Sequence, residues 1–307
     1  MTGTTMVRGG RSQRRIRPQR AALHAFLIVI SIVWLVPLLY AFYTSLRPVS
    51  DTIQHGYVSL STNLNFNNYI NVWQSAEIPY YYLNTLIVVI PGVILALFLA
   101  SLVAFAVSRF SFRFNVALLM MFTAGNLLPP QVIIVPLYWL YLAIPVPELI
   151  KLPFVGMFPS DNGLLYDQYV GIILIHVVFQ TGFCAFVLSN YMRTISKELN
   201  EAALVDGAGV WTIYSKVILP LCTPALAALA TLEFTWIYND FFWALLLMES
   251  GAKRPITSAL NNLQGSFFIN NNLLAAASLL AAIPTVIVFI ALQRQFVRGL
   301  TLGSTKG

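Results

Sequence analysis

The side chains best suited to binding or catalysis lie in one otherwise apolar run, LEFTWIYNDFFWALLL. This run contains Glu233, Trp236, Asn239 and Asp240. In a continuous helix Glu233, Trp236 and Asp240 would share one face, because they are spaced i, i+3 and i+7. An indole ring packs against the C–H faces of a sugar, while carboxylates and amides hydrogen-bond to its hydroxyls. The four residues are therefore candidates for lining a solute path or, equally well, for packing against another subunit.

No pattern in the sequence predicts catalysis or metal binding. His24, His55 and His176 are scattered, and His176 is better explained by hydrogen bonding inside a helix bundle than by catalysis. Cys184 and Cys222 lie in or beside apolar segments and indicate no disulfide framework. The sequence has no GxxxxGK[ST] phosphate loop. We therefore expect a non-enzymatic chain with no catalytic residue, no metal and no cofactor of its own.

The amino-acid composition indicates what kind of structural elements must position these residues. Of 307 residues, 58% are hydrophobic and only 9% are charged, and the mean hydropathy is +0.75. Soluble domains carry about 25% charged residues, so the chain is predicted to cross a membrane several times. The net charge of +7 would also suit nucleic-acid binding, but no interleaving of aromatic and basic residues supports that partner.

Six apolar stretches are long enough to cross a bilayer, which requires about 20 residues in a helix. Backbone groups in hydrocarbon must find partners within their own segment, so the prediction is an all-α polytopic membrane helix bundle with six transmembrane helices. The predicted spans are Ala22–Ser45, Tyr81–Val107, Val116–Ile144, Tyr169–Tyr191, Thr223–Met248 and Leu273–Leu292.

The distribution of lysine and arginine predicts the orientation of these spans. With a cytoplasmic amino terminus, the outward loops hold few of the 18 basic residues, namely Arg47, Lys151, Lys253 and Arg254. This asymmetry follows the positive-inside rule and places both termini in the cytoplasm. The first apolar run is too long for the core of a signal peptide, so we expect an uncleaved first span.

One stretch of the second half, Glu201–Pro220, is too polar to be a span, and we call it the knuckle. Apolar residues recur at helical spacing on both sides of Gly207, with Val210, Ile213, Tyr214 and Val217 following it. A sharp change of direction between two short helices predicts a positive φ at Gly207, and Pro220 is expected to close the second helix.

The spacing of the knuckle resembles the EAA loop of the membrane-spanning subunits of ABC importers. The matching residues are Glu201, Ala202, Ala203, Asp206, Gly207, Leu219 and Pro220, and the Asp206-Gly207-Ala208 run is similar to the sugar-importing branch. TSLRP, NYINVW, NTLIVVIPG, LPPQVIIVPLY and QRQFVRGLTLGSTKG extend the resemblance to maltose-type sugar permeases over nearly the whole chain. The alternative is an ordinary amphipathic helix pair at the membrane interface.

The resemblance implies a type I ABC importer permease fold in a bacterial plasma (inner) membrane. It implies a basic tail over 1–21, a first span and outward loop over 22–80, and a transmembrane domain over 81–292. The EAA coupling loop lies at about 196–220, and 293–307 form a cytoplasmic tail. The outward loop 145–168 is longer than that family leads us to expect, either as a plain insertion or as a docking segment.

The implied partners are a second permease chain, a dimeric cytoplasmic ATPase that holds ATP and Mg, an extracellular solute-binding protein, membrane lipid and a sugar. In that family the bound sugar can sit mainly on the partner permease. Three alternatives stay open: a permease for a non-sugar solute, a secondary transporter that uses intramembrane carboxylates, and an intramembrane enzyme, for which no constellation is visible.

Overall fold

The computed structural model describes residues 18–75, 77–127, 129–146, 163–260 and 270–301. All regular elements of these residues are helices, and an isolated bridge joins Pro145 to Leu164. The predicted all-α class is therefore confirmed. Most of the long outward loop, 147–162, and the ends 1–17 and 302–307 lie outside the described residues, as do parts of both predicted tails.

Four helices are long and apolar enough to cross a bilayer on their own, and two bent helix pairs raise the possible number of spans to six. The four long helices are α1 (Pro18–Leu46), α4 (Ile78–Arg109), α7 (Tyr169–Thr194) and α14 (Asn271–Thr301). One bent pair consists of α5 (Asn115–Leu127) and α6 (Pro130–Ala143). In the second pair, Val210–Leu221 meets α11 (Thr223–Tyr238) at 73°.

The prediction of one continuous helix was wrong for two of the spans. The third is divided between α5 and α6 just before Pro130, because Pro129 and Pro130 cannot donate backbone hydrogen bonds and disfavour helix in the residue before them. The fifth ends at Tyr238 and resumes as α12 (Phe242–Leu247). Hydropathy detects apolar length and does not detect such breaks.

Small residues allow the central helices to pack closely. α4 lies along α7, and α11 lies against α14 and α4. On α4 the buried positions include Gly92, Ala96, Ala100, Ser101 and Ala104, a series of small side chains of the kind that brings membrane helices together. A Cβ at Gly92 would come 3.2 Å from the Ile237 side chain. The buried apolar residues form two clusters, one toward each end of the bundle.

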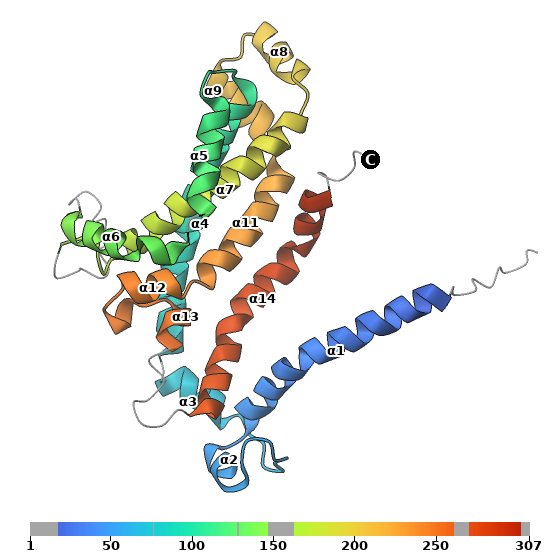
Figure 1. The fold of residues 1–307 in the computed structure, drawn as a ribbon, viewed down its shortest axis with the longest axis vertical. Helices are drawn as coiled ribbons and strands as arrows, with labels where there is room; N and C mark the ends of the chain where they lie inside the picture. The colour runs from blue at the N-terminus through green and yellow to red at the C-terminus, as the bar shows by residue number, and fades with distance from the viewer. Residues whose placement is uncertain (1–17, 76, 128, 147–162, 261–269, 302–307) are drawn as a thin grey trace, which may run out of the picture.

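The two ends of the bundle carry different structures. Figure 1 shows α8 (Glu198–Val205) and α9 (Val210–Thr212) at one end, and α2 (Val49–His55) and α3 (Asn67–Ser75) at the other. The carboxyl end of α14 lies on the same side as α8, and α1 diverges from the bundle (Figure 1). This arrangement agrees with a knuckle and a first loop on opposite sides of a membrane.

Candidate functional site

The knuckle turns at Gly207, as predicted. Gly207 has φ +79°, and the amides of Gly207 and Ala208 donate to the carbonyls of Leu204 and Ala203 at 3.0 and 2.9 Å. These two bonds form a Schellman motif, which ends a helix through a residue in the left-handed region. Among the described residues, and apart from its two chain neighbours, no heavy atom lies within 4 Å of the position that a Gly207 Cβ would occupy. The backbone conformation, rather than lack of space, requires glycine here.

A serine just before the N-cap position, Lys197, closes the start of α8. Ser196 Oγ accepts a hydrogen bond from the Glu198 amide at 3.2 Å and donates one to the Glu198 carboxylate at 2.7 Å. Glu198 and Glu201 both lie in the first turn, where the helix dipole favours negative charge. Both ends of this short helix are therefore closed by local hydrogen bonds.

The second half of the knuckle contains a wider turn than the sequence predicts. α9 continues into a π-helical segment, η2 (Ile213–Ile218), and then into α10 (Leu219–Leu221). The amide of Leu219 donates to the Tyr214 carbonyl, one residue beyond α-helical spacing. Pro220 therefore lies in the last turn, and in a regular α-helix its ring would clash with the carbonyl of Lys216.

The apolar face of this second half differs in part from the predicted stripe. Ile213 and Tyr214 are buried as expected, but Val210 is exposed, and Ile218, which lay outside the predicted stripe, is fully buried. Val217 is partly buried against the same cluster. The π turn shifts the side chains that follow it by one position, which accounts for the burial of Ile218, whereas Val210 precedes this turn and faces outward.

Tyr214 attaches the knuckle to a membrane helix. Its hydroxyl lies 2.7 Å from Ser101 Oγ of α4, and its ring meets Phe105 at 5.3 Å between centroids. Both hydroxyls are buried. The sequence alone predicts Tyr214 as an apolar contact, and Ser101, which lies 113 positions earlier, gives no local signal of this bond.

Most of the α8 surface is free of contacts with the rest of the chain. No residue of α8 is buried. Val205 is 88% exposed and Trp211, just beyond the turn, is 62% exposed. Of the residues that carry the predicted motif, Glu201, Ala202, Asp206, Gly207 and Pro220 are exposed, while Ala203 and Leu219 are partly buried against the neighbouring apolar cluster.

The polar residues of the fifth span separate into different environments. Glu233 is completely buried, and its Oε1 accepts a hydrogen bond from the Cys184 thiol of α7 at 3.1 Å. Its Oε2 has no partner among the described residues. Trp236 is half-exposed, and its ring packs at a tilt against that of Phe183, with 5.2 Å between centroids. Glu233 therefore faces this chain's own interior, while Trp236 reaches the surface.

Asp240 does not share a helical face with Glu233, contrary to the prediction, because α11 has already ended. Its carboxylate accepts hydrogen bonds from the amides of Trp243 and Ala244 at 3.2 and 3.1 Å and so caps α12. His176 Nε2 lies 3.5 Å from the same carboxylate. Asn239 is exposed, with its amide donating to the Thr235 carbonyl at 2.8 Å. The break between α11 and α12 thus leaves Asn239 exposed at the surface and Asp240 partly buried.

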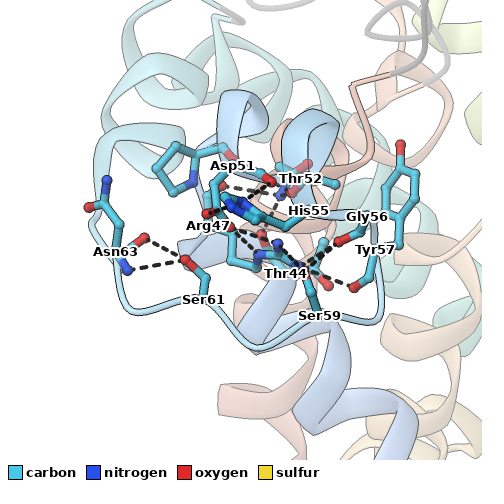
Figure 2. A network of polar contacts seen from close by, with 12 residues as sticks. Thr44, Arg47, Asp51, Thr52, His55, Gly56, Tyr57, Ser59, Ser61 and Asn63 are labelled. Atoms are coloured by element: carbon cyan, nitrogen blue, oxygen red, sulfur yellow. Dashed lines mark hydrogen bonds and ion pairs between the residues drawn. The ribbon is translucent and has the colours of Figure 1, made fainter.

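A polar network at the opposite end of the bundle was not predicted. Arg47, only 1% exposed, donates to Asp51, to the carbonyls of Gly56 and Tyr57 and to Ser59 Oγ, at distances from 2.7 to 3.2 Å (Figure 2). The guanidinium group holds the pKa of Asp51 below its ordinary value. Arg47 therefore holds the loop after α2 together with Tyr40 and Tyr43, whose hydroxyls donate to the carbonyls of Tyr57 and Ser59 at 3.1 and 3.0 Å.

The same network joins α1 to α14. The amide of Asn272, at the start of α14, donates to the carbonyls of Thr44 and Arg47 and to Thr52 Oγ1. Asn68 of α3 donates to the carbonyls of Ser45 and Arg47 at 2.8 Å each. The TSLRP and NYINVW segments singled out in the sequence contain Arg47 and Asn68, but nothing in them predicted that the two segments meet.

Several helices of membrane-spanning length, with a capped helical protrusion at one end, are the features of a polytopic membrane protein. The chain belongs to the family of binding-protein-dependent transport system inner membrane components, which matches residues 92–302. The predicted resemblance to permeases of carbohydrate ABC importers is confirmed by its relatives.

Two curated relatives align over almost the whole chain. The osmoprotective compounds uptake permease protein GgtD of Synechocystis is 30% identical and aligns over 94% of this chain and 93% of its own. The diacetylchitobiose uptake system permease protein NgcG of Streptomyces coelicolor is 29% identical over 92% and 88%. A crystal structure of a bacterial ABC transporter involved in the import of alginate contains a chain of the same fold, with a TM-score of 0.73 at 23% identity, covering 95% of this chain and 100% of that one.

Proposed function

We propose that this chain is one of two membrane subunits of an ATP-driven importer for a sugar or oligosaccharide, and that the knuckle couples it to a cytoplasmic ATPase. The observation that carries this proposal is the α8 protrusion. It is capped at both ends and has no buried residue, and it is followed by the exposed Trp211. A rigid apolar surface of this kind fits the groove of a soluble partner.

The coupling step follows from the way the knuckle is attached. Closure of two ATPase subunits on ATP would displace α8, and the buried Tyr214–Ser101 contact would pass that displacement to α4. The ATPase must favour one membrane conformation over the other for transport to be driven, since a partner with equal affinity for both shifts nothing. ATP and Mg belong to those subunits in this proposal, and this chain holds neither.

The solute path is proposed to run beside the break in the fifth span. Trp236 and Asn239 are exposed there, close to the helix cap formed by Asp240. Irregular backbone at membrane depth is tolerated where protein or a water-filled cavity surrounds it. This surface is suited both to lining the solute path and to contacting the second permease. No residue in the most apolar 18-residue stretch of α1 is buried against the described part of this chain. The second permease or lipid must therefore cover that stretch.

The orientation proposed places α8 and both termini in the cytoplasm and the Arg47 loop outside, in a bacterial plasma membrane. An external solute-binding protein would then deliver the sugar on the side of the Arg47 network. The rigid loop beyond α2 suits such docking, because Val58 is 90% exposed while Arg47 fixes the backbone beside it.

The test is purification of the tagged chain from its native membrane, followed by reconstitution. We expect a second permease and an ATPase to co-elute, and ATP-dependent uptake of an oligosaccharide once the binding protein is added. Transport by this chain alone, driven by an ion gradient, would refute the importer. Uptake restricted to other solutes would refute the sugar while leaving the ATPase coupling intact.

A further inference from the structure

A cleft beside the knuckle carries a chemistry that coupling does not use. It is open to solvent, has a volume of about 440 Å³ and lies where α4 ends, α5 begins and α7 ends. Its lining includes Arg109, Arg193 and Lys197 together with Ser108, Ser111 and Asn115, and none of its described lining residues is acidic. Three cations therefore line one space, while the Ser108 hydroxyl and the Asn115 side-chain amide already donate to backbone carbonyls.

The backbone and one buried donor add to this positive character. Asn115 is the first residue of α5, so the positive end of that helix's dipole lies at the cleft and favours an anion there, while the Asn115 backbone amide itself donates to the Phe112 carbonyl. The two terminal nitrogens of Arg109 donate hydrogen bonds to the carbonyls of Met192 and Ile195, at 2.9 and 3.1 Å. Its buried Nε has no partner among the described residues.

The two remaining cations are free to bind a ligand. Arg193 and Lys197 are exposed, and within the described part of the chain their side chains make no hydrogen bond or ion pair. Glu201 lines an adjoining pocket of about 210 Å³ and does not line this cleft. The positive charge is thus uncompensated inside the cleft itself.

We propose that this cleft binds a phosphate group, and that its ordinary source is the headgroup of an anionic membrane lipid. Phosphate oxygens match the fork of arginine and the point charge of lysine. Exposed rings flank the cleft at the same turn, with Phe114 69% exposed and Phe112 also exposed. Aromatic and basic side chains together are typical of protein surfaces at the lipid boundary, and basic pockets between membrane helices bind lipid headgroups.

The inference rests on the membrane class of the chain and is independent of the proposed coupling. The test uses the full chain, purified in detergent with the subunits that co-elute. One arm measures retention of phosphatidylglycerol against phosphatidylcholine by native mass spectrometry. The other measures binding of inorganic phosphate by calorimetry. Each arm compares Arg193→Gln and Lys197→Gln with Arg20→Gln, which removes an exposed charge at the amino end of α1, outside the cleft.

We expect preferential retention of phosphatidylglycerol, weakened about fivefold by each cleft substitution and unchanged by Arg20→Gln. Phosphate binding that falls in the same two variants, without lipid retention, would keep the phosphate site and identify a soluble ligand as its source. Equal retention of both lipids with no phosphate binding, or losses equal to those of Arg20→Gln, would overturn the proposal. Because neither readout involves uptake, failure here would leave the proposed transport function untouched.

Discussion

Substitution of Gly207 by valine tests whether the shape of the knuckle matters for function. At φ +79° a β-branched residue is strained. No neighbouring atom lies within 4 Å of the new Cβ, so the cost comes from the backbone alone. A non-glycine residue in the left-handed region costs about 1–3 kcal/mol. Since about 1.4 kcal/mol is a factor of ten, the native turn should become roughly 5- to 150-fold less populated relative to its alternatives.

The matched control lies two residues further along the chain. Gly209 also has no atom within 4 Å of its Cβ position, but its φ of −71° and ψ of 163° suit valine. Gly209→Val therefore adds the same bulk to the same turn without strain. Gly207→Asn should give an intermediate result, because asparagine tolerates positive φ better than valine does.

The assay is purification of each variant complex, with bound ATPase, sugar-stimulated ATP hydrolysis and uptake measured side by side. Gly207→Val should still insert and pair with its partner permease, because no membrane helix includes this turn. We expect it to lose stable ATPase binding or the link between hydrolysis and uptake, while Gly209→Val keeps both. Wild-type values for Gly207→Val in all three measurements would refute the coupling role. Equal loss in Gly209→Val would show that bulk, rather than conformation, is responsible.

Three further outcomes are expected. The first concerns orientation and uses a chain in which Cys184 and Cys222 are replaced. Val58→Cys should react with an impermeant thiol reagent in intact cells, and Gly209→Cys should react only after permeabilisation. The reverse pattern would overturn the orientation. Asp240→Ala removes a helix cap worth about 1 kcal/mol and should lower uptake from an assembled complex, whereas loss of the second permease would favour a packing role for this region. Arg47→Lys cannot reproduce the fork of the guanidinium group and leaves acceptors unpaired, which should destabilise the loop by about 2 kcal/mol. Limited proteolysis should cut the loop after α2 faster in this variant than in the control Val58→Ala. Equal rates of cleavage in the two variants would contradict the network's role.

The parts of the fold that depend on local pattern were predictable from the sequence. Apolar length identified the membrane segments, and the glycine between two short helices identified a left-handed turn. The break at Asn239–Phe241 escaped because a hydropathy window averages over it. The Schellman geometry at Gly207 needs only neighbouring residues, whereas the Arg47 network needs Asn272, 225 positions away. Contacts of that separation exist only once the helices are packed.

The most consequential long-range feature is the position of α4 between the two ends of the bundle. Near one end Ser101 contacts Tyr214 of the knuckle. Near the other, the buried amide of Asn84 donates to the carbonyls of Ala252 and Arg254 at 2.7 and 3.1 Å. At 1.5 Å per residue the two contacts lie about 25 Å apart along one helix. The helix is continuous over that distance and passes an axial movement along its length, while Pro91 inside it, which has no backbone donor, gives it a point at which to bend. A displacement of the knuckle should therefore reach the far loop through α4, whereas the breaks in the third and fifth spans leave those segments free to bend.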